Sequence, residues 1–360
     1  MIGRSEVAQE SLSNPSRAMA RQFLVKDIAL QAGVSVATVD RVLHGRGGTR
    51  AHTVRRVEQA MRELERQSAQ VGLAGRKFMI DVVMQAPARF TDVVRAALEG
   101  EMPGLHPAVF RARWQLAEDQ PLENLVATLD AIAARGSHGV LLKAPDVEPI
   151  RAAIERLAAR RIPVVTLVTD VPRSARLAYV GMDNRAAGET AAYLIGQFLP
   201  RRRAGVLVSL SSSRFQGEEE REIGFRQAIR AHHPHLTVHE VSEGLSLYQA
   251  TARLVRERLR EWPDVRAVYS VGGANAAILE AFERLGRECR FFVGHDLDAD
   301  NLPLLRRGAV NVLLHHDLRH DMRAACRHVM RAHGVGHGAE APGLSAVQVV
   351  TPFNVPGFVL

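Results

Sequence analysis

Hydrophobic residues recur with two different periods along the chain. From Val25 to Gln67 they follow a helical spacing, in three runs separated by Gly33 and by residues 44–50, which predicts three short helices. From Phe78 onward, short apolar runs rich in β-branched residues alternate with amphipathic segments. These nine runs, each predicted to be a strand, are 78–85, 108–116, 138–144, 162–170, 204–211, 236–242, 265–273, 289–298 and 310–317.

The nearly continuous apolar character of these runs is typical of parallel strands that helices cover on both faces. Nine or more such units exceed one sheet, so we expect an α/β body of two doubly wound lobes with a ligand crevice at the carboxyl ends of the strands. The predicted organisation is a disordered lead-in (1–21), a three-helix domain (22–67), a small-residue linker (68–77) and the body (78–360). We expect the chain to cross between lobes near 180 and 315, and 349–360 to form a last strand with a short tail.

Composition narrows the class of protein. With 360 residues, 46% hydrophobic and 24% charged, the chain has the balance of a folded globular protein. No apolar stretch approaches the ~18 residues that a membrane span needs, and the first twenty residues lack the apolar core of a secretory signal. Two cysteines, Cys289 and Cys326, provide neither a disulfide framework nor a four-cysteine zinc site. We therefore expect a cytoplasmic protein that does not contact membranes.

The net charge of +8 is concentrated near the amino end. Residues 1–77 carry 13 Lys and Arg against 7 Asp and Glu, whereas the remaining residues carry 34 against 32. A compact basic segment before a near-neutral body indicates a domain that binds a polyanion, most simply nucleic acid. A solvated basic tail would have the same composition.

The segment 25–48 has the features of a helix-turn-helix. Ala29 allows two helices to approach closely, Gly33 provides the turn, and Val39 with Val42 forms an apolar pair on the second helix. Ser35 is a favourable amino cap for that helix. Its exposed face would then be Val36, Ala37 and Thr38, which would meet base edges in the major groove, with Arg41 one turn further on, able to reach a guanine or a phosphate. The alternative is a helical hairpin packed on another domain.

Residues 25–43, VKDIALQAGVSVATVDRVL, resemble the amino-terminal signature of LacI family (lactose-repressor-like) transcriptional regulators without interruption. The resemblance implies that Val36, Ala37 and Arg41 read bases, that Thr38 and Thr53 lie near the DNA backbone, and that Leu73 is a hinge leucine entering the minor groove. The candidate DNA contacts are therefore Val36, Ala37, Thr38, Arg41, His44, Thr53 and Leu73.

Three positions depart from the family pattern. Asp40 stands where the family usually has Ser, His44 replaces a frequent Asn, and Arg50 replaces a Ser that usually caps the third helix. We expect Asp40 either to turn inward and pair with an arginine or to mark a subgroup with different DNA contacts. The linker is also shorter than in the founding member, so Leu73 is either a groove wedge or an ordinary linker residue.

The resemblance continues in order through 163–170, 179–188, 221–225, 268–278 and 292–298. It implies that the body is a periplasmic-binding-protein-like (type I) effector domain. A polyol site needs planar donors and acceptors for paired hydroxyls and an aromatic face for the C–H surface. The candidates are Phe90, Asp170, Asn184, Arg221, Asn275, Asp296 and His316, the last standing where a Gln is common. For each, a structural ion pair, a cap or an internally satisfied polar group is the alternative.

No known enzyme signature occurs in the chain: no phosphate-binding loop, G-x-S-x-G or H-E-x-x-H. The alternating Asp296, Asp298 and Asp300 lack the glycine and glutamate of a calcium loop, and His316 with His320 lacks a third metal ligand. We predict no catalytic residue, cofactor or metal. The expected protein is a transcriptional regulator, by default a repressor, that senses a sugar or related polar metabolite and binds a pseudo-palindromic double-stranded operator as a homodimer. The alternatives are a solute-binding protein of the sugar-transport type and a small-molecule enzyme on the same scaffold.

Overall fold

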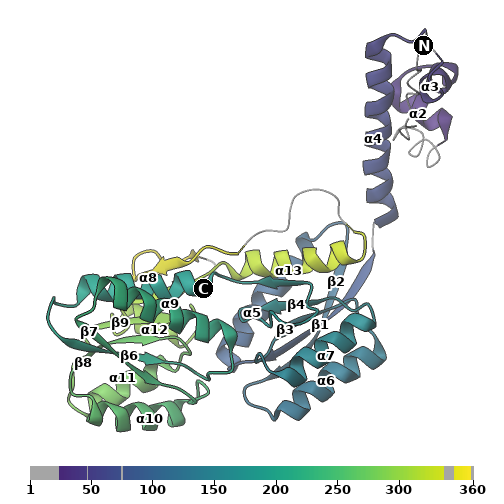
Figure 1. Ribbon diagram of the computed structural model, residues 1–360. Coiled ribbons are helices and arrows are strands. Elements are labelled where there is room, and N and C mark those ends of the chain that lie inside the picture. Colours follow the sequence, from purple (N-terminus) through teal and green to yellow (C-terminus); the bar gives the residue numbers. More distant parts are fainter. Residues whose placement is uncertain (1–23, 47, 74–75, 336–343, 358–360) are drawn as a thin grey trace, which may run out of the picture. The chain divides into compact units, whose positions relative to one another are not determined.

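The computed structural model describes residues 24–46, 48–73, 76–335 and 344–357, with the backbone alone at 65–73 (Figure 1). The predicted lead-in, 1–21, lies outside the described residues. The chain divides into two compact units, Met1–Arg76 and Lys77–Leu360. No described helix is both long enough and apolar enough to cross a membrane.

The first unit contains helices α2 (Val25–Ala32), α3 (Val36–Leu43) and α4 (Ala51–Leu73). Its core consists of buried residues at helical spacing, among them Ile28, Ala29, Val39, Val57 and Met61. The prediction of three helices is confirmed, and the last of them extends into the small-residue linker predicted over 68–77. Helix α4 continues to Leu73, because residues 65–71 contain neither Pro nor Gly and favour a helix, and a strand already begins at Lys77.

A parallel five-stranded sheet, in the order β2-β1-β3-β4-β5, forms the first lobe of the second unit. Its strands are β1 (Lys77–Gln85), β2 (Val109–Ala117), β3 (Gly139–Lys143), β4 (Val164–Leu167) and β5 (Ala178–Val180). One face carries α6 (Leu122–Arg135) and α7 (Glu148–Ala159), and the other carries α5 (Ala88–Glu101) and α13 (Leu318–Ala332). A short 3-10 turn, Met102–Gly104, follows α5.

The second lobe is a six-stranded sheet in the order β11-β10-β9-β8-β6-β7, in which only β11 runs antiparallel to its neighbour. Its strands are β6 (Ala204–Ser209), β7 (Leu236–Val241), β8 (Val265–Ser270), β9 (Phe291–His295), β10 (Val312–His315) and β11 (Gln348–Val350). The helices α8 (Asn184–Phe198) and α9 (Gln216–His232) cover one face. The other face is covered by α10 (Tyr248–Glu261), α11 (Asn275–Arg284) and α12 (Asn301–Arg306).

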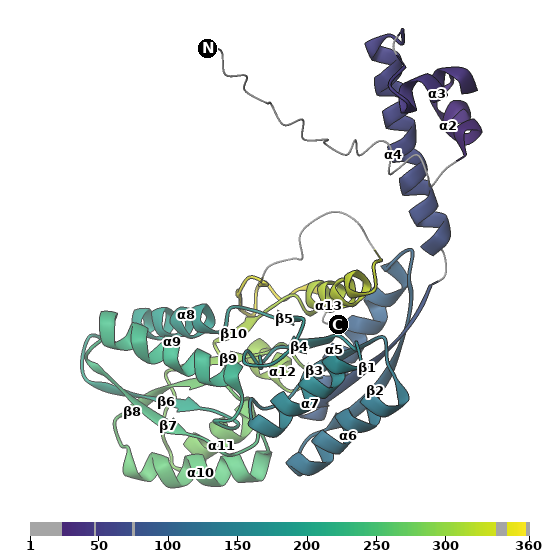
Figure 2. The same ribbon diagram turned by 45° about the vertical axis from the view of Figure 1, so that its right-hand side comes forward.

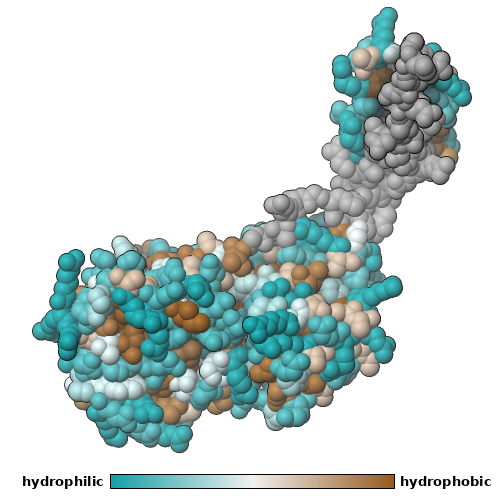
Figure 3. Space-filling model, viewed as in Figure 1, coloured by the Kyte–Doolittle hydropathy of each residue, from teal (hydrophilic) through white to brown (hydrophobic). Residues whose placement is uncertain are grey.

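The predicted α/β fold is confirmed, and the two sheets lie side by side, each between helical layers (Figure 2). Each of the nine predicted runs contains a strand, while β5 was not predicted because its three residues carry no periodic signal. The chain passes from the first lobe to the second after β5, returns after β10 to form α13, and crosses again to reach β11. On the face seen in Figure 3 the body is mostly hydrophilic, with scattered hydrophobic residues.

Candidate functional site

The turn between α2 and α3 depends on Gly33, which has a φ of 60° in the left-handed region that favours glycine. Arg56, from α4, donates one terminal nitrogen to the carbonyl oxygens of Ala32 at 2.8 Å and Gly33 at 3.3 Å. A Cβ at Gly33 would lie 2.9 Å from that nitrogen. Arg56 therefore ties the turn to the third helix, a role for which the sequence carries no local signal.

Helix α3 exposes the face that the sequence predicts. The Ser35 hydroxyl caps the helix by accepting the Thr38 backbone N–H at 3.2 Å, and the two hydroxyl oxygens are 2.8 Å apart. Val39 is fully buried, whereas Val36 is 52% exposed and Ala37 is exposed too. Thr38, the third residue of the predicted face, is half-buried. Arg41 is also exposed, and its Nε donates to the Ala37 carbonyl at 3.2 Å.

The unusual Asp40 has basic partners. Its carboxylate lies 3.1 Å from Arg46 Nη1 and 2.9 Å from His44 Nδ1. The pairing with an arginine expected for Asp40 is thus present, although the group stays partly exposed rather than turning inward. The negative charge at this end of α3 is compensated, and His44 is held by the same carboxylate.

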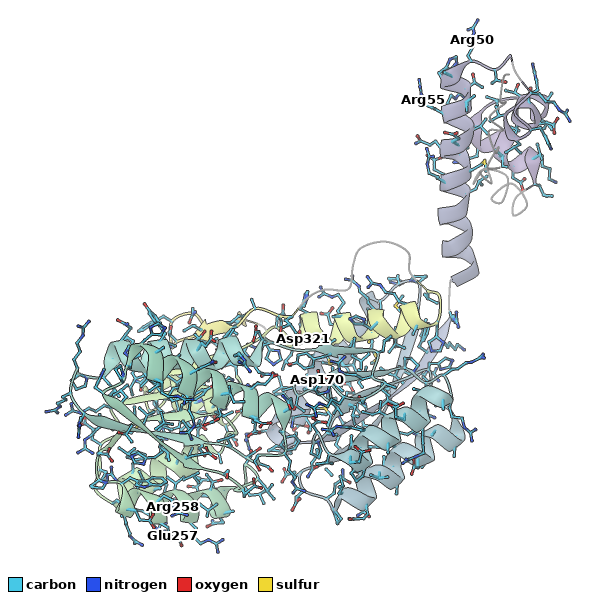
Figure 4. All side chains as sticks on the ribbon, in the orientation of Figure 1. Arg50, Arg55, Asp170, Glu257, Arg258 and Asp321 are labelled. Carbon is cyan, nitrogen blue, oxygen red and sulfur yellow. The ribbon has the colours of Figure 1, made fainter. Side chains whose placement is uncertain are left out.

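The remaining predicted DNA contacts lie on α4. Thr53 is in its first turn, where the hydroxyl lies 3.2 Å from His52 Nε2. Arg50 and Arg55 project outward from the same end of the helix (Figure 4). Leu73 ends α4, and its side chain lies outside the described residues.

In the second unit, a cavity of about 70 Å³ lies between the lobes, next to the carboxyl ends of β1, β3, β4, β6, β8 and β9. This is the place expected for a ligand in an open parallel sheet. The structure brings three of the predicted residues to its wall: Phe90, Arg221 and Asp296.

Arg221 projects from α9 into the cavity and is 4% exposed. Its Nε donates to the Asn184 side-chain oxygen at 2.7 Å, whereas Nη2 has no hydrogen-bond partner among the described residues. Asn184 in turn donates to the Tyr179 hydroxyl at 3.0 Å. Asn184 thus does not line the cavity, and instead holds the guanidinium in place.

His295 and Asp296 follow one another at the end of β9. His295 Nε2 lies 2.8 Å from the Tyr269 hydroxyl, but His295 Nδ1 and Asp296 Oδ1 lack partners in the described structure. Burial, with Arg221 nearby, lowers the pKa of His295 well below its usual range, so the ring is neutral at pH 7. Together with Arg221 Nη2, the cavity offers a charged donor, a charged acceptor and a neutral imidazole nitrogen that nothing else in the described chain uses.

The backbone around this cavity is strained. Among its lining residues, Val168, Leu245, Ser246 and Asp296 all have φ between 50° and 66°. Such values are uncommon for residues other than glycine, above all for a β-branched valine, and they cluster at functional sites.

Charged groups that the sequence analysis did not select also line the cavity. Lys143, the last residue of β3, donates to the Gln85 carbonyl at 3.0 Å, and burial lowers its pKa to about 8. Arg89 and Asp298 form an ion pair, with Arg89 Nε 3.1 Å from an Asp298 oxygen. Lys143 and His295 are both the last residues of strands. The expectation that ligand-binding side chains lie at the carboxyl ends of strands could therefore have predicted them as well as Asp296.

Three other predicted residues do not reach the cavity wall. Asp170 pairs with Arg176 and accepts the Thr166 hydroxyl at 2.7 Å within the first lobe (Figure 4). Asn275 donates to Asn301 Oδ1 at 2.7 Å, and His316, fully buried, faces Asp321. Neighbouring side chains contact each of these residues, although Asn275 Oδ1 and His316 Nε2 have no hydrogen-bond partner among the described residues. Their contact with a ligand stays a prediction. Among the described residues, no three His, Cys, Asp or Glu side chains group as metal ligands.

Comparison with protein families assigns both units. Residues 24–66 match the family of bacterial regulatory proteins called the lacI family, and residues 82–334 match the periplasmic binding protein domain. No curated protein matches the chain in a sequence search.

Solved structures share the fold of the body. GanP, a glucose-galactose binding protein from Geobacillus stearothermophilus, is 18% identical over 78% of this chain and 99% of its own, with a TM-score of 0.68. An ABC transporter solute binding protein from Agrobacterium vitis with bound D-fucose is 16% identical over 78% and 97%, with a TM-score of 0.67. A Bacteroides fragilis protein proposed to be a LacI transcriptional regulator is 17% identical over 78% and 98%, with a TM-score of 0.65. The chain therefore belongs to the lacI family, as a ligand-responsive DNA-binding regulator that joins a helix-turn-helix domain to a periplasmic binding protein domain.

Proposed function

We propose that this regulator is a repressor that binds a pseudo-palindromic operator as a homodimer and is released by a sugar or related polyol. The main support for ligand binding is that Arg221, His295 and Asp296, which line one cavity, each have a polar atom without a hydrogen-bond partner among the described residues. Buried polar groups are almost always hydrogen-bonded, so a site that leaves three of them unused is built for a polar ligand.

The chemistry of these atoms favours a polyol. The Arg221 guanidinium can donate to one hydroxyl oxygen and the Asp296 carboxylate can accept from a neighbouring hydroxyl, while neutral His295 can do either. Phe90, 6% exposed, supplies an apolar face for the C–H surface of a ring. That related folds bind glucose, galactose and D-fucose supports the same class of ligand.

For DNA, Val36, Ala37 and Arg41 would read base edges, and Thr38, His44 and Thr53 would lie near the phosphates. The exposed, capped start of α3 supports this assignment. In a two-fold dimer, two identical helix-turn-helix domains would each face one half-site, and this gives the operator its symmetry. Leu73 remains a candidate minor-groove wedge.

Regulation follows from linkage between the two sites. A ligand held by residues of both lobes favours their closed arrangement, and it shifts DNA binding only to the extent that it prefers one of the two states. No step in this scheme makes or breaks a covalent bond, so we propose a binding protein rather than an enzyme. Because its target is chromosomal DNA, we place it in the cytoplasm.

The test begins with a thermal-shift screen of sugars, polyols and sugar acids, since a ligand of the folded state raises the melting temperature. Gel shifts with genomic fragments then measure operator binding with and without the hit, over a range of salt concentrations. The Arg221→Ala variant should bind the operator normally but lose the response to the ligand. The control is Arg226→Ala on the same helix, because Arg226 pairs with Glu222 and Glu240 and does not line the cavity.

An unchanged response in Arg221→Ala would remove Arg221 from the site. The absence of a specific, salt-sensitive complex with every fragment would refute the regulatory proposal.

A further inference from the structure

A second crevice lies beside the polyol cavity, between α5 of the first lobe and the elements β9 to α13. It has a volume of about 370 Å³, within the range of small-molecule pockets. Most of its wall is apolar: Val93 and Ala97 come from α5, Leu297 and Leu302 from the segment after β9, and Leu318 from the start of α13.

One buried polar side chain opens into this apolar crevice. His315, the last residue of β10, is 2% exposed, and neither of its ring nitrogens has a hydrogen-bond partner among the described residues. Burial and neighbouring His316 lower the pKa of His315 to about 4, against the opposite effect of Asp296, Asp317 and Asp321. The ring is therefore neutral at pH 7 and offers one N–H donor and one acceptor. Leaving both unused costs free energy that a ligand would recover.

The two cavities share an ion pair in their lining. Arg89 and Asp298, 3.1 Å apart, line both of them. Asp298 is anchored as well by the backbone N–H groups of Asp300 and Asn301, at 3.1 and 2.8 Å. His315 lines the crevice and not the polyol cavity, so a molecule in the crevice reaches His315 without entering the polyol site.

We propose that this crevice is a second small-molecule site, for a compact, largely apolar, uncharged molecule with a hydroxyl group that hydrogen-bonds His315. The apolar part of the wall disfavours a sugar, because hydroxyls placed against it would lose their hydrogen bonds to water without replacement. Charges of both signs surround the site, Arg89 and Arg319 with Asp92 and Asp298, so its surroundings favour neither an anion nor a cation.

The test uses the full-length protein and two fluorinated probes followed by 19F NMR: 4-fluorophenol, which has the hydroxyl, and 4-fluorotoluene, which lacks it. We expect 4-fluorophenol to bind saturably and about fivefold more tightly, the value of one hydrogen bond of ~1 kcal/mol. In His315→Leu the two probes should bind equally. Failure of wild-type protein to bind 4-fluorophenol, or equal binding of both probes to it, would overturn the proposal.

A variant that blocks the crevice tests whether the probe binds there while His315 is left unchanged. Ala96 is an exposed crevice residue on α5, so Ala96→Phe should fold normally, fill the crevice and abolish binding. The matched control is Ala127→Phe at an exposed position of α6, outside the crevice. Equal binding by these two variants would refute the assignment to this crevice. Neither measurement needs an operator or a sugar, so its outcome is independent of the proposed repressor function.

Discussion

Gly188 allows α8 and α9 to pack at a separation that no side chain would permit. A Cβ added there would lie 1.9 Å from the Arg221 carbonyl oxygen and 2.8 Å from the Phe225 backbone nitrogen. The facing Gly224 is in the same situation, with a Cβ 2.3 Å from the Arg185 carbonyl oxygen. These neighbours are backbone atoms, so they cannot rotate away, and the 1.9 Å contact falls about 1.5 Å short of an ordinary 3.4 Å contact.

The Gly188→Ala variant should therefore destabilise the body. Overpacking of this kind costs ~1–3 kcal/mol and occasionally more, while alanine recovers up to ~1 kcal/mol of helix propensity. We expect a net loss of about 2 kcal/mol, which corresponds to a melting temperature lower by about 5 °C for a domain of this size. Since the displaced backbone carries Arg221, the response to the effector should weaken as well.

Gly100→Ala is the matched control, because the same atoms are added to α5, where the nearest neighbour is the mobile end of Arg319 at 3.4 Å. This variant should be as stable as the wild type or up to ~1 kcal/mol more stable. Scanning calorimetry measures the melting temperatures of both variants. If Gly188→Ala melted no lower than Gly100→Ala, the helix–helix distance, and the placement of Arg221 that depends on it, would be wrong.

Further predictions concern the helix-turn-helix domain (the head, residues 24–73) and the cavity wall. Arg41→Ala should weaken operator binding by ~1–3 kcal/mol if Arg41 reads a guanine, as measured by fluorescence anisotropy, and an equal loss on random DNA would show a phosphate contact instead. Ser35→Ala removes the cap of α3 and should cost about 1 kcal/mol in the thermal unfolding of the head; unchanged unfolding would rule out a stabilising cap. Burial raises the pKa of Asp298 from 3.8 to about 6, so its contribution to the free energy of unfolding, relative to Asp298→Asn, should fall by about 3 kcal/mol as the pH rises from about 3 to about 7. In urea titrations, a difference between those two proteins that did not change with pH would contradict this assignment.

Local sequence patterns were sufficient to predict the fold. The helical period of residues 25–67 and the apolar runs after Phe78 reflect which side of each element is buried. The structure has helices in the first segment and strands in the second, as predicted. Helix α4 is longer than predicted because the small-residue stretch 68–73 contains no residue that forces an end before Gly72. Gly33 and Ser35 were predictable because turns and caps depend on neighbours in the sequence.

The ligand cavity was only partly predictable, because its polar groups differ in what surrounds them rather than in type. Arg221 and Asp296 line the cavity and keep unused atoms, whereas the equally polar Asp170 and His316 do not line it and instead contact Arg176 and Asp321. These partners lie only six and five residues away in the sequence, but no sequence pattern shows that they pair. The same is true of Arg56, whose partners lie 23 and 24 residues earlier in the chain.

We propose that occupancy of the body cavity changes the affinity of the helix-turn-helix domain for DNA. Titration of the wild-type protein onto a labelled operator fragment, with and without the sugar that most raises its melting temperature, measures this coupling. We predict a salt-sensitive, sequence-specific complex whose dissociation constant rises at least tenfold with the sugar, a coupling of about 1.4 kcal/mol. An operator affinity that the bound sugar leaves unchanged would contradict the account.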